Sequence, residues 1–430
     1  MSKAYSYDPI DTMEKNNQQV AINAIKKKLV GKKLSYPEIF AIMDEIANKR
    51  LGPVLTTYFT AAGFREGFTD DELYHLTKAM VETGPKLHFT GIVADKHSTG
   101  GVAGTRTTMI LVPIIAAAGF KIPKNSSRAI TSPAGTADTM EVIAPVTFMP
   151  RQIEKIVEKV GGCIVWGGHL GLAPADDVII QVEKPLAFES FDKIVVSVFA
   201  KKVASGATHV VMDIPVGPTL KIQHFKDADV IAQKYQFLAK KFHMKIVIDI
   251  NEMHENAGRG VGPVLEVKDV LSVLEQKKDR PLTLEEKALR LAGKLLTICL
   301  KDGKQKGVDG ESLAREILLS GKAHKKMLEI IKAQGGDPGV ESDRIKSGKF
   351  THEVVSGRRG RVTAIDNHQI TIICRILGCP TDKASGIYQN RKLEETVDKG
   401  DILCTLFSSD KWRLKEAAET IKNIPMYRIA

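Results

Sequence analysis

Cysteine is scarce in this chain of 430 residues, and its five cysteines are scattered without a single C-x-x-C pair. We therefore expect neither a disulfide framework nor a zinc site, and the cysteine usage fits a reducing compartment such as the cytoplasm. Long hydrophobic runs are missing as well. The longest, Met109–Phe120, has twelve residues and contains Pro113, whereas a membrane span needs about 20. Residues 1–19 hold no apolar run, so we expect neither a secretory signal nor a membrane partner.

Aromatic residues are few, at 6% of the chain, and no long basic run is interleaved with them. Lysine and arginine still outnumber aspartate and glutamate by 62 to 51, which gives a formal net charge of +11. Such an excess favours nucleic acid or small anions as partners. Without a basic and aromatic stretch, we expect small anionic ligands and no nucleic acid. The composition is that of a globular protein, and the length predicts two or three domains.

The first part of the chain, residues 17–85, is expected to be helical. Ser35–Glu38 and Thr69–Glu72 each have the S/T-x-x-E spacing of a capping box, in which a hydroxyl and a carboxylate satisfy backbone N–H groups at a helix start. A β-like stretch that ends at Ala94 follows, and after it comes a glycine-rich loop at 97–104.

Short strands and helices then alternate. Residues 209–214 and 245–250 have the pattern of strands, and a helical pattern around 227–243 lies between them. This order predicts a βαβ unit and a parallel sheet. Three more segments have strongly helical patterns, namely 107–119, 284–300 and 322–335.

The pattern changes after Gly348. Segments of β type at 360–365 and 369–374 are separated by turn-forming residues. The stretch Gly335–Gly339 supplies a flexible joint, so we place a domain boundary near residue 345.

The segment Asp95–Thr108 combines a strand end, three glycines and a helix start. Glycine lets the backbone approach an anion closely, and the N–H groups at a helix start point toward it. Lys96 adds a positive charge, and Ser98 and Thr107 add hydroxyl donors, so the segment could hold a phosphate. Its spacing is neither that of a Walker A loop nor that of the dinucleotide fingerprint. A plain glycine-rich turn is the alternative.

A second segment, Ser126–Thr139, is dense in hydroxyl groups and also contains one guanidinium and one carboxylate. Such donors are costly to bury unless something pairs with them. A ligand rich in anionic or hydroxyl groups would do so, and an exposed loop is the alternative.

These segments carry a resemblance to a known family. Lys96–Gly101, with the sequence K-H-S-T-G-G, resembles the phosphate loop of the thymidine and pyrimidine nucleoside phosphorylases. Ser127–Val142 resembles the AMP phosphorylase branch of that family. The match continues through Val160–Gly168, Leu172–Asp177 and Asp213–Pro218. The similarity runs from about residue 20 to the end of the chain.

The resemblance implies phosphorolysis, in which inorganic phosphate displaces the base from the anomeric carbon of a nucleoside or nucleotide. The expected reaction converts AMP and phosphate to adenine and ribose 1,5-bisphosphate. Phosphate is a co-substrate, and neither a cofactor nor a metal ion is expected. A thymidine or pyrimidine nucleoside phosphorylase is the alternative within the family. A non-catalytic nucleotide-binding sensor is the alternative from another class.

The resemblance also implies roles for individual residues. The phosphate-binding positions are Lys96, Ser98, Thr107, Ser126 and Thr136. The substrate-binding positions are Gly101, Ser127, Arg128, Ala129, Ile130, Thr131, Ser132, Thr136, Ser197, Lys201 and Lys221. Arg128 or Lys221 could hold a 5′-phosphate as a second anion site.

The proton donor of the AMP branch is an aspartate eight residues before the position of Ser197, and Glu189 stands there in this chain. A glutamate can act as a general acid if its pKa is raised. His97 is the alternative acid. Ser197 and Lys201 lie four residues apart, so both should project from one face of a helix. Val182 stands where the pyrimidine enzymes have an arginine, which argues against standard pyrimidine recognition.

The implied fold is α/β plus all-α, and the implied domains follow from the family. They are a discontinuous helical domain of residues 1–85 and 174–208, a central α/β domain with a mixed or parallel sheet at 86–173 and 209–345, and a C-terminal α+β domain at 346–430. Two features depart from the AMP branch: a longer N-terminal extension is missing, and Thr99 is typical of thymidine enzymes. We expect a homodimer or a higher homo-oligomer that assembles through the N-terminal helices.

Overall fold

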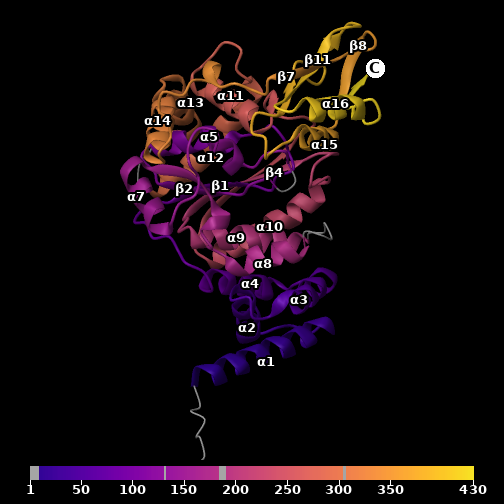
Figure 1. The fold of residues 1–430 in the computed structure, drawn as a ribbon. Coiled ribbons are helices and arrows are strands. Elements are labelled where there is room, and N and C mark those ends of the chain that lie inside the picture. The colour runs from indigo at the N-terminus through magenta and orange to yellow at the C-terminus, as the bar shows by residue number, and fades with distance from the viewer. Residues whose placement is uncertain (1–8, 130–131, 184–189, 304–306) are drawn as a thin grey trace, which may run out of the picture. The chain divides into compact units, whose positions relative to one another are not determined.

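A computed structural model describes residues 9–129, 132–183, 190–303 and 307–430. The chain divides into two compact units, which we call the helical unit and the mixed unit (Figure 1). The helical unit contains residues 1–88, 170–206 and 231–244. The mixed unit contains residues 89–169, 207–230 and 245–430.

The helical unit begins with four consecutive helices, which confirms the helical prediction for residues 17–85. Two later segments of the chain complete it. Its helices are α1 (Pro9–Leu29), α2 (Tyr36–Ala47), α3 (Gly52–Glu66), α4 (Asp70–Glu82), α8 (Pro174–Glu183), α9 (Phe191–Ala204) and the last part of α10 (Phe225–Lys241).

Both predicted capping boxes form. The backbone N–H of Ser35 donates to Glu38 at 2.7 Å, and that of Thr69 donates to Glu72 at 2.9 Å. Because the polar group at each helix start is satisfied locally, the apolar faces of the helices are free to pack. Phe199 of α9 and Tyr235 of α10 stack inside this unit with their ring centroids 6.4 Å apart.

The mixed unit is built on parallel strands. β1 (Ala94–Ser98), β4 (His209–Val216) and β5 (Lys245–Glu252) form one parallel sheet, and β2 (Ile122–Ser126) pairs in parallel with β3 (Gly162–Trp166). The predicted strands at 209–214 and 245–250 and their parallel pairing are confirmed, as is the intervening helix. The strand expected to end at Ala94 begins there instead, because β1 extends along β4 as far as Ser98.

The helices of the mixed unit include the three predicted from apolar patterns at 107–119, 284–300 and 322–335. The three predicted helices are α5 (Thr107–Ala117), α12 (Leu282–Asp302) and α14 (Lys322–Ala333). The neighbouring helices are α6 (Thr136–Met140), α7 (Pro150–Val160), α11 (Pro263–Leu274) and α13 (Gly310–Leu319), and short 3₁₀ turns lie at Gly167–His169 and Ser342–Arg344. Residues 107–116 of α5 are all buried, and its apolar side chains from Met109 to Ala116, apart from Pro113, belong to the main hydrophobic core. This burial explains why α5 is apolar on every side.

The C-terminal part of the mixed unit has antiparallel strands. β7 (Phe350–Val355), β11 (Ile402–Ser408), β9 (Gly386–Gln389) and β6 (Gly260–Val261) form one sheet, and β10 (Thr396–Val397), β8 (Gly360–Ile365) and β12 (Tyr427–Ile429) form another. The helices α15 (Asn367–Leu377) and α16 (Lys411–Thr420) pack on each other. An α+β character was expected for this part of the chain.

The prediction of a β-type segment at 369–374 is wrong, because these residues lie in α15. Asp366 caps the helix by accepting from the backbone N–H groups of His368 and Gln369 at 2.9 and 3.0 Å. Ile370, Ile373, Cys374 and Leu377 follow one another at helical spacing, and all are buried. The β-branched residues favour a strand locally, but the cap and this buried face favour the helix more. Within the described residues, no helix is long and apolar enough to cross a membrane.

Candidate functional site

The glycine loop, which we define as residues 99–106, joins β1 to α5. Gly100, Gly101 and Gly104 have φ angles of 85°, 86° and 59°. Residues with a Cβ rarely adopt these conformations, so the path of the loop depends on glycine. The first helical residue after the loop is Thr107. The first N–H groups of α5 therefore lie beside the loop, where a helix start favours an anion.

Lys96 lies next to this loop in β1 and is only 3% exposed. Its ammonium group is 3.8 Å from a carboxylate oxygen of Asp213 and 3.4 Å from the hydroxyl of Thr108. Asp213 also pairs with Lys287 at 3.0 Å. Burial raises the pKa of Asp213, but the two lysines outweigh that effect, so its pKa lies below the usual value. Two ammonium groups around one carboxylate leave an excess of positive charge at this point.

Three buried hydroxyl groups near the loop have no hydrogen-bond partner among the described residues. They belong to Thr99, Thr107 and Ser126. An unsatisfied buried hydroxyl costs about 1–3 kcal/mol, so three of them together require an explanation. Thr99 and Thr107 flank the glycine loop, and Ser126 ends β2, whose chain is bridged to β1 through Lys121 and Val93. Hydroxyl donors beside an excess positive charge are suited to hold an oxyanion.

Arg106 links the glycine loop to the segment that contains Thr136. Its guanidinium donates to Thr136 at 3.4 Å, to the carbonyl of Ala134 and to the carboxylate of Glu266. Thr136 is the first residue of α6, whose next N–H donates to the carbonyl of Ser127 at 3.3 Å. Arg106, the last residue of the glycine loop, therefore connects this loop to Thr136 at the start of α6.

Arg128 is engaged by protein carboxylates. Its guanidinium donates to Glu141 at 2.7 Å with two nitrogens and to Asp138 at 3.1 Å, and it lies over the ring of Trp166, 4.7 Å from the centroid. The hydrogen bonds from Arg128, together with Lys383, lower the pKa of Glu141 to about 2.

The rest of the substrate-binding block is folded around Asp138. Its carboxylate accepts from the backbone N–H groups of Ala129 and Gly135 at 2.7 and 2.8 Å. The hydroxyl of Ser132 donates to the carbonyl of Ala134 at 2.7 Å. The predicted positions Ile130 and Thr131 lie outside the described residues.

Lys221 lies directly against the glycine loop. A Cβ added to Gly101 would stand 3.0 Å from the backbone nitrogen of Lys221 and 3.1 Å from its Cβ. Gly101 is therefore required at this position both for its φ angle and for the close approach of Lys221. Two predicted substrate-binding positions that are far apart in sequence are brought together here.

The helical unit holds a second cluster of predicted residues. Ser197 and Lys201 of α9 both donate to the same oxygen of Asp176 in α8 at 2.7 Å, which confirms that they share one face of the helix. Asp176 is fully buried. Burial raises the pKa of Asp176, but Lys201 and Ser197 have the larger opposite effect, so this pKa lies below the usual value. The neighbouring Asp177 has its pKa raised to about 6, mainly by burial. Glu189 lies outside the described residues.

Several residues of this region were missed by the sequence analysis. Asn367 contacts the backbone of the glycine loop from α15, and Asn256 donates to the carbonyl of Ala103 at 2.9 Å. Arg106 belongs to the motif that was singled out, but its spacing gave no sign of its partners. Neither asparagine carries a sequence signal, because each acts through a contact across more than 150 residues of chain.

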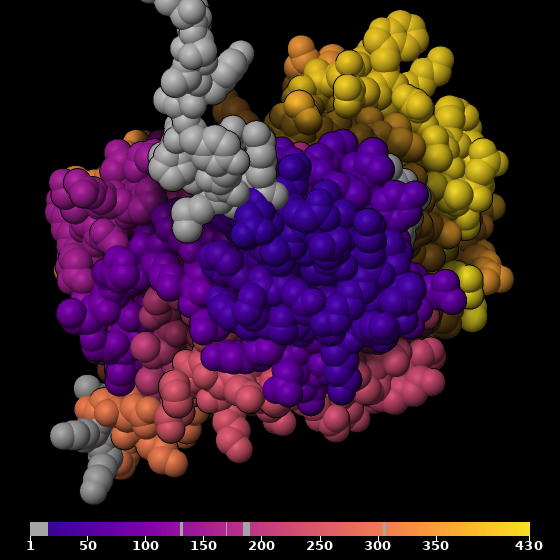
Figure 2. Space-filling model, turned by 90° about the horizontal axis from the view of Figure 1, so that it is seen from below, coloured from indigo at the N-terminus to yellow at the C-terminus, as the bar shows by residue number. Residues whose placement is uncertain are grey.

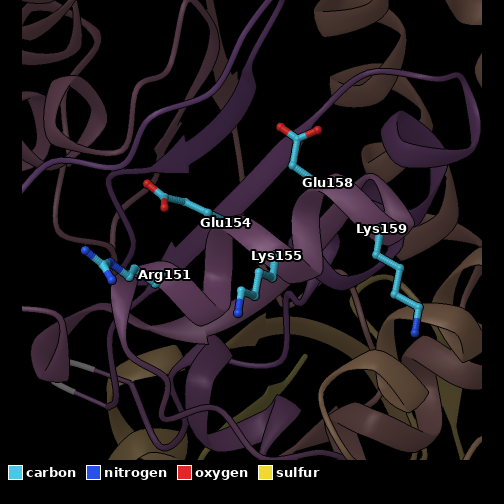
Figure 3. A pocket seen from close by; sticks show the side chains of 5 residues that line it. All are labelled: Arg151, Glu154, Lys155, Glu158 and Lys159. Atoms are coloured by element: carbon cyan, nitrogen blue, oxygen red, sulfur yellow. The ribbon is translucent and has the colours of Figure 1, made fainter.

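A surface hollow on α7 shares no residue with these clusters. It is lined by Arg151, Glu154, Lys155, Glu158 and Lys159 (Figure 3). Their side chains extend from the outer surface of one helix (Figure 3), and their charges have both signs. Such a surface is typical of a solvated helix face, and we assign it no function.

Comparisons with known protein families match three parts of the chain. Residues 22–84 match the helical bundle domain of the glycosyl transferase family, and residues 90–324 match its a/b domain. Residues 361–427 match the pyrimidine nucleoside phosphorylase C-terminal domain. Together these matches cover most of the sequence.

Curated relatives match nearly the whole chain. An "AMP phosphorylase" of Thermofilum pendens is 43% identical over 411 residues, which are 95% of this chain and 78% of that protein. A "Putative thymidine phosphorylase" of Legionella pneumophila is 40% identical over 427 residues, which are 97% of this chain and 81% of that protein. Among solved structures, anthranilate phosphoribosyltransferase from Thermus thermophilus matches with a TM-score of 0.58 and 18% identity. The match covers 72% of this chain and 99% of that one, and it shows a shared fold.

Proposed function

Since the chain belongs to the thymidine and pyrimidine nucleoside phosphorylase family of pentosyltransferases, we propose that it phosphorolyses a nucleoside 5′-monophosphate, with AMP as the substrate. The products would be adenine and ribose 1,5-bisphosphate. One observation carries the proposal, namely the buried hydroxyls of Thr99, Thr107 and Ser126 at the ends of the glycine loop and of β2, which have no hydrogen-bond partner among the described residues. They form a donor set without an acceptor, which inorganic phosphate would complete.

In the proposed reaction, a phosphate oxygen attacks the anomeric carbon and the bond from that carbon to the base nitrogen breaks. The electron pair of that bond stays on the base, which gains a proton. Lys96, Ser98, Thr107, Ser126 and Thr136 would hold the phosphate in line for attack. The bound phosphate needs no activation by a cofactor or a metal ion, so we assign neither.

The other half of the substrate is assigned to a second set of residues. Ser197 and Lys201 would bind the base, because Asp176 fixes both on one face of α9. Glu189 would donate the proton to the leaving base, and His97 is the alternative donor. A general acid in this place contributes typically 10²–10⁴-fold to the rate.

The 5′-phosphate is assigned to Lys221. Arg128 is the less suitable candidate, because two carboxylates already balance its charge. The backbone of Lys221 lies against Gly101 of the loop that would hold the inorganic phosphate. The 5′-phosphate of the substrate would therefore bind to Lys221, and the inorganic phosphate would bind to the adjacent glycine loop.

Two observations favour AMP over a pyrimidine nucleoside. Val182 stands where the pyrimidine enzymes have a base-binding arginine, and relatives named AMP phosphorylase are 41–43% identical. Thymidine phosphorylase is the second candidate, because relatives with that name are 38–40% identical and because Thr99 is typical of it.

Base release from separate substrates tests the proposal. The protein is incubated with phosphate and, in separate reactions, with AMP, CMP, UMP, thymidine or uridine, and the free base is measured. Adenine release from AMP that depends on phosphate would support the proposal. Release only from thymidine and uridine would favour the second candidate, and binding without release from any substrate would favour a nucleotide sensor.

We also propose a homodimer or a larger homo-oligomer in the cytoplasm. All five cysteines are free and buried, as suits a reducing compartment. On α3, Val54 and Tyr58 are 66% and 54% exposed and lie four residues apart on one helix face. Figure 2 looks onto the N-terminal helices, coloured indigo, to which α3 belongs. Light scattering should find an oligomer that Val54→Glu with Tyr58→Glu converts to a monomer, whereas a monomeric native chain would contradict the proposal.

A further inference from the structure

We infer that Asn367 in α15 is a positioning residue for the phosphate of the reaction, because its amide fixes the backbone of the glycine loop. Its nitrogen donates to the carbonyl of Gly101 at 2.6 Å, and its oxygen accepts from the N–H of Ala103 at 3.0 Å. The residue is 5% exposed, so water competes little for these bonds. The inference rests on the proposed function, since it concerns the same phosphate site.

The loop needs an external support of this kind. Gly100 and Gly101 both have positive φ angles. The backbone of glycine has more accessible conformations than that of any other residue, so ordering the loop costs more conformational entropy. Hydrogen bonds within the loop therefore have to be supplemented by contacts from outside. One planar amide that pairs with a carbonyl and with the N–H group two residues later acts as a strand neighbour would, and it selects a single backbone conformation.

Asn367 is itself held rigidly. It is the first residue of α15, and its carbonyl accepts from the hydroxyl of Thr371 at 2.9 Å. The preceding residue, Asp366, caps the helix through two backbone N–H groups. A side chain at the fixed start of a capped helix loses little further freedom when it binds the loop, so its bonds contribute effectively to order.

A second contact supports the loop from the segment that follows β5. Asn256 donates to the carbonyl of Ala103 at 2.9 Å. The ammonium group of Lys392 in turn donates to the carbonyls of Asn256 and Gly258. Two residues after position 361 therefore support the glycine loop. Asn367 contacts the loop directly, and Lys392 acts through Asn256. This arrangement gives the C-terminal part of the chain a role at the phosphate site.

The consequence for binding is specific to phosphate. Lys96 and Ser98 precede the glycine loop and Thr107 follows it, so a loop that moves also displaces the donors at its two ends. An anion would have to order such a loop on binding, and that cost weakens its affinity. Ser197 and Lys201, the residues proposed to bind the base, contact Asp176 instead, whereas the amide of Asn367 contacts the glycine loop.

The test compares Asn367→Asp, Asn367→Ala and the control Asn390→Ala. Aspartate keeps the shape and the acceptor but loses the donor toward Gly101. Asn390 lies in the same part of the chain, and its amide accepts from Thr405 at 3.0 Å. Two quantities are measured for each variant: the KM values for phosphate and for AMP, and the Kd for inorganic phosphate alone by calorimetry.

We expect both Asn367 variants to raise the KM and the Kd for phosphate at least about tenfold, with the KM for AMP changed by less than about twofold. Asn390→Ala should resemble the native enzyme. A native phosphate Kd in Asn367→Asp would overturn the inference and leave the proposed function intact. Equal losses of both affinities, or loss of the folding transition in Asn367→Asp, would show only a structural role and would also overturn it. A native enzyme that binds no phosphate would instead overturn the proposed function.

Discussion

The hydroxyl of Thr107 offers a sharp test of the proposed phosphate site. The side chain is 0% exposed, and its oxygen has no partner within the described part of the chain. Thr107→Val keeps the shape of the side chain and removes only the hydroxyl. If the hydroxyl serves a ligand, the substitution should have opposite effects on stability and on binding.

The two magnitudes follow from general hydrogen-bond energetics. An unsatisfied buried hydroxyl costs about 1–3 kcal/mol, so Thr107→Val should raise the free energy of unfolding of the phosphate-free protein by about 1 kcal/mol. A hydrogen bond to a charged group contributes about 1.5–3 kcal/mol. Its loss should raise the Kd for phosphate by about 10- to 100-fold.

Thermal unfolding with and without phosphate, together with calorimetric titration of phosphate, measures both effects. Thr77→Val is the matched control, because Thr77 is equally buried but its hydroxyl donates to the carbonyl of Leu73 at 2.8 Å. The control should be slightly destabilised and should keep its affinity for phosphate. A lower Tm for Thr107→Val without phosphate, or an unchanged Kd, would refute the reasoning.

Four further predictions concern single substitutions. Lys96→Ala should raise the KM for phosphate in steady-state kinetics, and an unchanged KM would remove Lys96 from the site. Glu189→Gln should lower kcat at least about tenfold, whereas an unchanged kcat would move the acid role to His97. Burial raises the pKa of Asp177 from 3.8 to about 6, so the folded state is destabilised as the pH rises through this range. Asp177→Asn should therefore raise the Tm at about pH 7, and the gain should vanish near pH 4 in melting curves; a gain independent of pH would contradict the assignment. The pKa of Glu141 is lowered from 4.5 to about 2, so its stabilisation is present above about pH 4.5 and is lost toward pH 2. Glu141→Gln should lower the Tm at about pH 7 but not near pH 2, and equal Tm values at about pH 7 would argue against the ion pair with Arg128.

Local signals predicted much of the fold. The capping boxes at Ser35 and Thr69 satisfy backbone groups within one turn, so four residues of sequence contain the whole interaction. The strands β4 and β5 were predicted because a helical pattern between two apolar segments leaves a parallel pairing as the natural outcome. The segment at 369–374 was mistaken for a strand, because its β-branched residues outweighed the cap at Asp366 in the sequence pattern.

The candidate site was predictable only in part. The glycine loop, Lys96 and Thr107 lie in one short segment, so the sequence and the family resemblance suffice to predict both residues as phosphate ligands. The contacts of Asn367 and Asn256 with Ala103 join residues that are 264 and 153 positions apart. A single asparagine belongs to no periodic pattern or motif from which such a distant partner could be predicted. The carboxylates that engage Arg128 carry no sequence signal either, because they follow it by 10 and 13 residues.

A crystal structure of the protein with bound phosphate tests the central claim most directly. The account predicts an anion beside the glycine loop, within hydrogen-bond distance of the Lys96 ammonium group and of the hydroxyls of Thr107 and Ser126. Phosphate bound elsewhere, with no anion in contact with these three side chains, would contradict the proposed phosphate site.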